Sequence, residues 1–406
     1  MSNAPDTDSP ANRPAKRLPA TTDCSAEAVE ARQDRLREQG CQIDQIAGVG
    51  PAIDPSTLKG SIEGFIGFAR VPLGIAGPVR IHGAAAQGEF FIPLATSEGT
   101  LVASYQHAFN AMNRSGGTAA LCSGEQVQRA PCFEFASLEE AGRFATWLAS
   151  QQELVAATTA GTSRYCRLLD MHPHIVGNTV YLLLEFTTGD AAGQNMVTAA
   201  AEATCRQLLE AAPITPASWL VESVLSGDKR ASAMSFRAPR GRNASAEVIL
   251  PARQYGRYWR AAPEEAARAW RQATNGAVQT GAVGLQGNVA NALAALFIAC
   301  GQDVACVAEA TTALTRIEVT RDGDLYASVT LPNLIVGTVG GGTHLPTAQE
   351  CLGMLGCIGA GQARKFAEIC AVVALAGELA IVGAMASGGF SSAHAAGGRK
   401  GQGEPS

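Results

Sequence analysis

Four ionisable residues stand in short sequence contexts that suit charge stabilisation and proton transfer. They are Glu98 in Ala-Thr-Ser-Glu-Gly, Lys229 in Ser-Gly-Asp-Lys-Arg, Asp303 after Ile-Ala-Cys-Gly-Gln, and His394 in a Gly/Ser/Ala-rich tail. Taken singly, each has a structural explanation, since a carboxylate complements the start of a helix and charged loop residues are usually solvated. Lysine chemistry has few candidates, because the lysines are Lys16, Lys59, Lys229, Lys365 and Lys400.

Two glycine-containing segments are candidates for binding a ligand through the backbone. Residues 189–196 (Gly-Asp-Ala-Ala-Gly-Gln-Asn-Met) are expected to follow a strand and begin a helix. That position is open to anion binding by free N–H groups or to simple N-capping by Asp190. Residues 337–343 (Gly-Thr-Val-Gly-Gly-Gly-Thr) allow the backbone to approach a ligand closely or to make a tight turn, and the turn is favoured on local grounds. Neither segment has the Rossmann pattern.

Composition limits the class of protein. The chain has 406 residues, of which 47% are hydrophobic and 17% charged, so it can bury a large core and is not a disordered protein. The net charge is −5, with 31 basic and 36 acidic residues, so no nucleic-acid partner is expected. Residues 1–22 lack an apolar signal region, and we expect a disordered tail there.

The cysteines and the most apolar segment indicate a cytoplasmic protein without a membrane span. The 11 cysteines are scattered through apolar runs without a C-x-x-C pair, so reduced thiols are expected and no metal site. Residues 369–385 are strongly apolar but short for a bilayer, and Glu378 interrupts them. A buried core helix is therefore predicted.

The hydrophobic pattern predicts an α+β protein. Helices are expected over 25–39, 96–114, 138–152, 191–211, 263–275, 288–300, 347–355 and 362–385. Strands are expected over 90–94, 162–170, 179–187, 315–320 and 324–330. The alternation over about 133–223 indicates a small α+β domain within a larger, mostly helical region.

Five segments, taken together and in order, resemble 3-hydroxy-3-methylglutaryl-CoA (HMG-CoA) reductase of class I. They are FIGFARVPLGIAGP at 65–78, ATSEGTLVAS at 95–104, GDAAGQNMV at 189–197, IACGQD at 298–303 and IVGTVGGGT at 335–343. The resemblance covers residues 60–399. It implies a large, mostly helical acyl-CoA-binding domain (61–131 and 225–386) with an inserted ferredoxin-like NADPH-binding domain (132–224). It also implies a small N-terminal helical region (23–60) and a flexible catalytic tail (387–406).

The implied activity is a two-step, NADPH-dependent reduction of HMG-CoA to mevalonate for isoprenoid synthesis. By the resemblance, Lys229 stabilises the oxyanion that hydride transfer creates, and His394 protonates the departing CoA thiolate. Glu98 protonates the alkoxide, with a pKa raised by burial or a neighbouring acid. Asp303 is expected to tune both Lys229 and Glu98. The tail that carries His394 would act as a lid.

The resemblance also implies the cofactor contacts and a shared active site. Asp190, Gly193, Asn195 and Met196 match the cofactor helix, and Arg399 matches a tail arginine suited to the 2′-phosphate of NADPH. Family active sites form between two subunits, so a homodimer or higher homo-oligomer is expected.

The substrate-recognition residues depart from the family pattern. Matching positions for substrate contact are Arg129, Ser226, Asp228, Arg230 and Asn291. However, the loop before Lys229 is shortened, and Ala192 and Gln194 stand where class I enzymes usually carry methionines. His107 replaces an arginine that helps to hold CoA, and Asn288 replaces a histidine.

The family's second lysine, for the substrate carboxylate, is also missing. The chain has no lysine between Lys229 and Lys365, although Arg129 or Arg271 offers a substitute. Two alternatives therefore stay open: a reductase of another acyl-CoA or carrier-bound acyl group, or a repurposed non-reductase scaffold.

Overall fold

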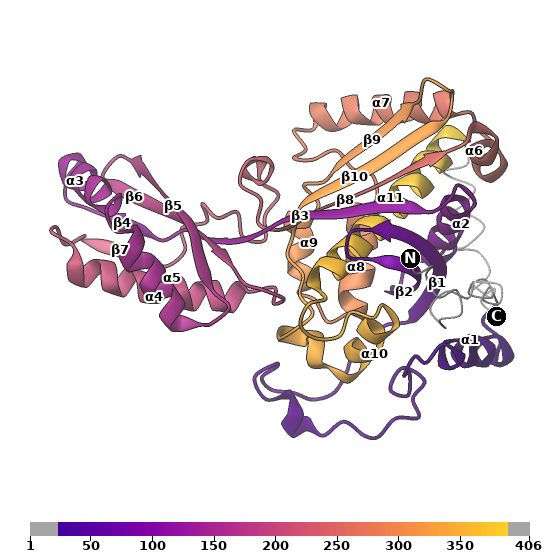
Figure 1. The fold of residues 1–406 in the computed structure, drawn as a ribbon, viewed down its shortest axis with the longest axis horizontal. Helices are drawn as coiled ribbons and strands as arrows, with labels where there is room; N and C mark the ends of the chain where they lie inside the picture. Colours follow the sequence, from indigo (N-terminus) through magenta and orange to yellow (C-terminus); the bar gives the residue numbers. More distant parts are fainter. Residues whose placement is uncertain (1–22, 389–406) are drawn as a thin grey trace, which may run out of the picture.

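The computed structural model describes residues 23–388. These residues form a larger and a smaller part (Figure 1). Strand β3 (Thr118–Arg129) runs from one part into the other. A ten-stranded sheet connects both parts, with the central order β7-β4-β6-β3-β8-β10-β9. The junction at the end of β3 is therefore where groups from both parts meet.

The N-terminal segment begins with α1 (Ala26–Glu38), close to the predicted bounds. The Ser25 side chain accepts a hydrogen bond from the backbone N–H of Ala28, which caps the helix. A short 3₁₀ helix, η2 (Pro55–Leu58), follows, and residues 59–72 then run along the larger part without regular structure.

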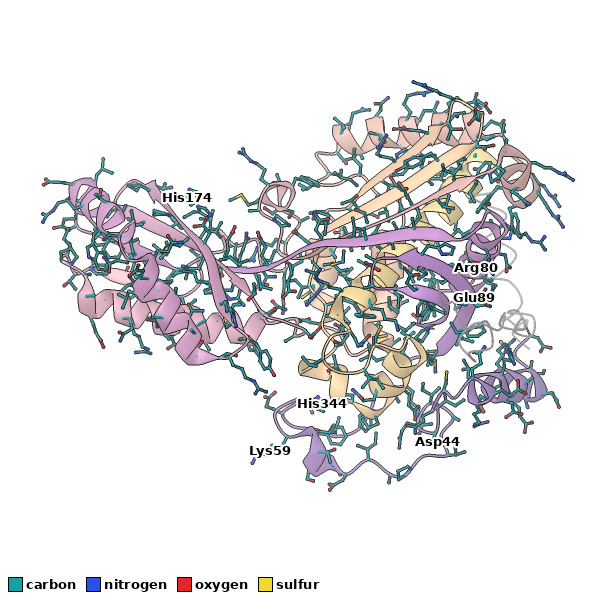
Figure 2. All side chains as sticks on the ribbon, in the orientation of Figure 1. Asp44, Lys59, Arg80, Glu89, His174 and His344 are labelled. Atoms are coloured by element: carbon teal, nitrogen blue, oxygen red, sulfur yellow. The ribbon has the colours of Figure 1, made fainter. Side chains whose placement is uncertain are left out.

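The larger part contains a sheet that the pattern of residues only partly predicted. Its strands are β1 (Leu73–Gly83), β2 (Gln87–Ala95), β3, β8 (Gly241–Leu250), β9 (Leu314–Val319) and β10 (Leu325–Leu334). The pairs are antiparallel except that β1 runs parallel to β3. Arg80 and Glu89 link β1 to β2 through an ion pair of 2.8 Å (Figure 2).

Helix α11 (Ala363–Ala386) lies at the centre of the larger part. It packs on α2 (Leu101–Arg114), α8 (Val289–Ala299), α7 (Pro263–Gln279), α6 (Ala252–Trp259) and the sheet. By length and composition alone α11 is apolar enough to cross a membrane, but 72% of its most apolar window is buried inside the protein. Its buried Glu378 accepts hydrogen bonds from the backbone N–H groups of Gly287 and Asn288 at the start of α8. The predicted core helix is confirmed.

The smaller part has the β-α-β-β-α-β order of a ferredoxin-like unit, with two helices, α3 and α4, in the place of the first helix. Its elements are β4 (Cys132–Glu134), α3 (Leu138–Leu148), α4 (Gln152–Thr162), β5 (Arg167–Val176), β6 (Thr179–Thr187), α5 (Gln194–Ala211) and β7 (Ser218–Leu220). Strands β7, β4, β6 and β5 lie side by side in that order and are antiparallel.

Four short helical turns and one nine-residue helix, α10, complete the described chain. They are η3 (Ala233–Phe236), η4 (Val304–Cys306), α9 (Val307–Ala310), η5 (Gly341–His344) and α10 (Pro346–Met354). Of these, η4 and α9 follow α8 directly, and α9 lies at the junction of the two parts (Figure 1).

The α+β class is confirmed, and the structure adds detail that the sequence pattern did not indicate. Strands β1, β3 and β8 were not predicted, so the larger part is less helical than expected. Gly74, Gly77 and Pro78 fall inside β1 and give the appearance of a loop. The helix expected over 96–114 begins only at Leu101, because Thr100 has a left-handed backbone with φ 71°.

Candidate active site

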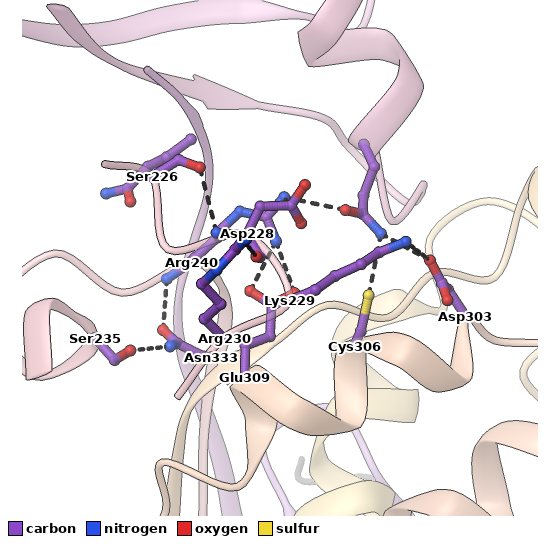
Figure 3. Close-up of polar contacts among 12 residues, drawn as sticks. Ser226, Asp228, Lys229, Arg230, Ser235, Arg240, Asp303, Cys306, Glu309 and Asn333 are labelled. Carbon is purple, nitrogen blue, oxygen red and sulfur yellow. Dashed lines mark hydrogen bonds and ion pairs between the residues drawn. The ribbon is translucent and has the colours of Figure 1, made fainter. Parts of the chain in front are cut away.

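Lys229 and Asp303, which lie far apart in the sequence, form an ion pair at the junction (Figure 3). The distance from Lys229 Nζ to Asp303 Oδ2 is 2.8 Å. Lys229 stands in the loop after β7 with a left-handed backbone, φ 55°. Asp303 is the N-cap of η4, and its Oδ1 accepts a hydrogen bond of 3.0 Å from the backbone N–H of Ala305. Lys229 and Asp303 therefore lie close together, as predicted.

The pair shifts the pKa of each partner toward its charged form. The hydrogen bond from Lys229 to Asp303 raises the pKa of the ammonium group above its ordinary value. Burial alone would raise the pKa of Asp303, but hydrogen bonds from Lys229 and Ala305 outweigh it, and the pKa is lowered. Because the side chains are 43% and 41% exposed, water screens the pair, and the contact holds the ammonium in place more than it stabilises the fold.

A buried network of opposite charges supports the Lys229 loop. Arg240 is 1% exposed, and its guanidinium lies 2.7 Å from both carboxylate oxygens of the fully buried Glu309. Arg240 also lies 3.0 Å from Asp228, the residue before Lys229. Arg129, at the end of β3, pairs with Asp228 at 2.8 Å and with Glu222 at 3.4 Å. The network thus fixes the loop from both parts of the protein.

The predicted substrate residues divide into buried and open positions. Ser226 is 3% exposed, and its hydroxyl donates to Glu222 at 3.0 Å. Arg129 is 6% exposed and is held by the two carboxylates. By contrast, Arg230 is exposed, and its guanidinium donates one hydrogen bond of 2.9 Å to the backbone carbonyl of Asp228. Arg230 is the predicted cation with the greatest freedom to meet a ligand.

Glu98 lies apart from the lysine–aspartate pair. It stands in the exposed loop before α2, and not in the first turn of the helix as predicted. Its Oε2 accepts a hydrogen bond of 2.6 Å from Asn291 Nδ2 on α8. Within the described residues, no hydrogen bond joins Glu98 to Asp303 or Lys229. Asn291 lies in the first turn of α8, whereas Asp303 follows the end of that helix, so the expectation that Glu98 sits beside Asp303 is not met within the described residues of one chain.

The predicted cofactor residues surround the start of α5. Gly193 is the N-cap with φ 81°, and no side chain caps the helix, so its first N–H groups are open. Asn195 is exposed in the first turn, whereas Met196 is half-buried and packs on the core. The carboxylate of Asp190 instead accepts hydrogen bonds from the backbone N–H groups of Gly361, at 2.7 Å, and Ala363, at 3.1 Å. Asp190 therefore connects this loop to the start of α11.

The glycine-rich segment 337–343 packs against the loop that precedes α5. A Cβ atom at Gly337 would lie 2.4 Å from the backbone nitrogen of Ala192, so only glycine allows this approach. The backbone N–H of Thr338 donates to the carbonyl of Asp190 at 2.9 Å. Gly340 and Gly341 have positive φ and face open space. The structure thus shows a close approach between two backbone segments, and the approach of a ligand to this segment stays a prediction.

The residues that replace family positions have local partners. His107 makes a hydrogen bond of 3.0 Å with the carbonyl of Tyr258, and burial lowers its pKa. Asn288 is the N-cap of α8, and Arg271 is exposed on α7. His394 and Arg399 lie outside the described residues. Between residues 23 and 388, no group of three or more His, Cys, Asp or Glu residues is arranged to hold a metal ion.

Fold and site together define an α+β protein with a ferredoxin-like part, an open helix N-terminus and a lysine–carboxylate pair between its two parts. A family model described as hydroxymethylglutaryl-coenzyme A reductase matches residues 28–399. The chain belongs to the hydroxymethylglutaryl-coenzyme A reductase family.

Relatives agree with this assignment, and a solved structure shares the fold. The chain is 38% identical to the 3-hydroxy-3-methylglutaryl-coenzyme A reductase of Pyrococcus abyssi, over 90% of this chain and 91% of that protein. It is 39% identical to that of Haloferax volcanii, over 92% and 93%. Among solved structures, the class II enzyme of Streptococcus pneumoniae bound to NADPH is similar with a TM-score of 0.68, covering 87% of this chain and 96% of that chain. At 19% identity, this last likeness shows the fold alone.

Proposed function

We propose that this chain reduces HMG-CoA to mevalonate and free CoA with two NADPH as hydride donors. The observation that carries the proposal is the Lys229–Asp303 pair, which puts a held ammonium group beside the open start of α5. The overall reaction is balanced: one thioester, two NADPH and two protons give one primary alcohol, one CoA thiol and two NADP⁺. The carbon–sulfur bond breaks between the two reductions.

Lys229 has the properties that this chemistry requires of an oxyanion-stabilising group. Its pKa is raised by Asp303, so the side chain stays an ammonium across the neutral range. A fixed positive charge aimed at the oxygen that becomes negative lowers the barrier more than a mobile one does. Asp303 and the Arg240 network supply that fixation.

The residues at the start of α5 fit a phosphorylated dinucleotide. The uncapped N–H groups after Gly193 favour an anion, and the helix dipole adds to this preference. Gly340 and Gly341 leave space beside the loop 189–192, where any side chain would take room. When bound, NADPH supplies the hydride. We assign Gly193, Asn195 and Met196 to its binding, Asp190 to holding the loop, and Arg399 to its 2′-phosphate.

Proton donation is assigned to Glu98 and His394. Asn291 holds the Glu98 carboxylate at 2.6 Å and so fixes its direction for protonating the alkoxide of the second reduction. His394 is the imidazole proposed to protonate the CoA thiolate. Because Glu98 does not contact Lys229 within the described chain, we infer that the complete site uses groups from two subunits.

A second copy of the chain is the proposed partner, in a homodimer or higher homo-oligomer. Apolar side chains are exposed along the irregular segment before β1: Ile62, Ile66, Phe68 and Val71 are 51%, 101%, 54% and 42% exposed. Several exposed apolar side chains within one short segment are typical of a contact surface. Sedimentation of Ile66→Asp tests it: we expect a shift toward monomer with loss of activity, and an unchanged dimer contradicts this surface.

Recognition of the substrate carboxylate is assigned to Arg230. One observation favours a second candidate substrate, because Arg129 is occupied by Asp228 and Glu222 and the family's second lysine is missing. That candidate is another acyl-CoA or carrier-bound thioester, reduced by the same residues. NADPH oxidation with HMG-CoA beside a panel of acyl-CoAs separates the two: the proposal expects turnover with HMG-CoA above all others.

The enzyme class and the cellular location are assigned from the motifs and from the packing of α11. We propose class I, on the five segments that resemble it, and a cytoplasmic location, on the burial of α11 within the core. The repurposed-scaffold alternative is opposed by the Lys229–Asp303 contact, since a site without function has no need of a held ammonium group.

A further inference from the structure

Gln194 connects the smaller part of the protein to the catalytic pair. It is the first residue of α5, whereas the groups that its carboxamide meets belong to the larger part. Its Nε2 lies 3.2 Å from Asp303 Oδ2 and 3.0 Å from the sulfur of Cys306. Its Oε1 accepts a hydrogen bond of 3.1 Å from Arg240.

Chemistry fixes which way this carboxamide points. A guanidinium only donates hydrogen bonds, so the amide oxygen must face Arg240. A carboxylate only accepts them, so the amide nitrogen must face Asp303. Arg240 is itself immobilised by Glu309 and Asp228. A continuous chain of contacts therefore runs from the buried acid Glu309 through Arg240 and Gln194 to Asp303 Oδ2.

The same oxygen of Asp303 receives both Gln194 and Lys229. Lys229 Nζ lies 2.8 Å from Oδ2, and Gln194 Nε2 lies 3.2 Å from it. The second oxygen, Oδ1, accepts the backbone N–H of Ala305. Gln194 thus holds the carboxylate on the side where the ammonium binds. A methionine, which is usual at this position in class I enzymes, has no hydrogen to donate.

We propose that Gln194 is a positioning residue that orients Asp303, and through it the Lys229 ammonium, from the cofactor side of the site. The inference rests on the proposed function, because it concerns the same catalytic pair. It assigns to this chain a polar link between the start of α5 and the pair, so that placing α5 also places Lys229.

The kinetic test compares Gln194→Met with Gln207→Met. Gln207 lies on the same helix, where its amide donates to Glu210 at 3.0 Å on the exposed surface. A hydrogen bond to a charged group is lost in Gln194→Met, so we expect kcat to fall about ten-fold to a hundred-fold. The KM for HMG-CoA should stay within about two-fold, since ground-state binding is not affected. Gln207→Met should match the wild type. An unchanged kcat in Gln194→Met overturns the proposal.

Gln194→Glu separates positioning from a merely structural role. The carboxylate keeps the shape of the side chain and the acceptor for Arg240, but it presents an oxygen to Asp303 in place of a donor. If Gln194 only fills space and bonds Arg240, this variant restores kcat. If it positions Asp303, kcat stays as low as in Gln194→Met or falls further, because two carboxylates now face each other.

A measurement without turnover makes the test independent of the substrate. The lysines are few, so reductive ¹³C-methylation gives a simple NMR spectrum in which the Lys229 signal is assigned by its loss in Lys229→Ala. Gln194→Met adds no charge, and it should lower the pKa of Lys229, because Asp303 is no longer held on the side of the ammonium. Gln207→Met should leave this pKa unchanged. An unchanged pKa of Lys229 in Gln194→Met overturns the proposal. If the wild type fails to reduce HMG-CoA, the proposed function fails, and this titration alone decides the role of Gln194.

Discussion

Arg129 lies 2.8 Å from Asp228, through its Nη1 and the aspartate Oδ2, and this contact occupies a residue that the sequence assigned to substrate binding. Glu222 lies 3.4 Å from the same nitrogen. The guanidinium is therefore part of the internal charge network. Arg230, two positions after Asp228, remains exposed beside Lys229.

Arg230→Ala should raise the KM for HMG-CoA about ten-fold, with little change in kcat or in the KM for NADPH. The reason is that a charge-assisted hydrogen bond to the substrate carboxylate disappears from ground state and transition state alike. Steady-state kinetics with each substrate varied in turn measures this. Arg271→Ala is the comparison, since Arg271 is exposed on α7 at the outer side of the larger part (Figure 1). A raised KM only in Arg271→Ala contradicts the assignment to Arg230.

Lys229→Ala should lower kcat by about 10²–10³, because the transition state loses its oxyanion-stabilising cation. Binding of NADPH, followed by fluorescence, should be retained. Lys59→Ala is the matched control: Lys59 is exposed on the N-terminal segment, away from the junction, and should keep full activity (Figure 2). Full activity of Lys229→Ala refutes the catalytic assignment and supports the scaffold alternative.

Asp303→Asn should move the alkaline limb of the kcat–pH profile to lower pH. Asp303 raises the pKa of Lys229, so in the wild type the ammonium persists to a higher pH than an ordinary lysine. With the carboxylate neutralised, the ammonium loses its proton at a lower pH, and activity falls earlier as pH rises. A profile measured over the alkaline range tests the sign. A limb that stays in place or moves upward shows that Lys229 is not the titrating group.

Arg240→Met should destabilise the protein by about 3–5 kcal/mol, because Glu309 is left buried without its cation. Urea unfolding gives the free energy of unfolding. Arg206→Met, which breaks the exposed pair with Glu202 on α5, should change it by no more than about 1 kcal/mol. Equal effects of the two substitutions are incompatible with a buried, structurally required Arg240–Glu309 pair.

The fold was predictable from the sequence wherever one face of an element is regularly apolar. Helix α11 and strand β6 match their predicted bounds closely, because burial imposes the pattern directly. Strand β8 was missed because Arg242 and Asn243 stand within it. Arg242 is buried, but a charged residue at a buried position breaks the apolar pattern that predicts a strand. Its three-dimensional contacts with Glu125 and with the carbonyls of Val336 and Gly189 explain that arginine.

The candidate site was predictable as a set of residue types but not as a set of contacts. The proximity of Lys229 to Asp303 followed from the resemblance. The role of Gln194 did not, because a glutamine in place of a methionine signals only a departure. Its meaning depends on Arg240 and Asp303 lying on either side, and no local pattern encodes contacts between residues so far apart in the sequence.

The stoichiometry of NADPH oxidation with HMG-CoA tests the central claim most directly. Purified protein with limiting HMG-CoA and excess NADPH should oxidise two NADPH per HMG-CoA and release one mevalonate and one free thiol. The thiol is measured by a colorimetric reagent and mevalonate by mass spectrometry. NADPH binding without oxidation in the presence of HMG-CoA would contradict the claim. Turnover with a different acyl thioester would then establish the same chemistry on another substrate.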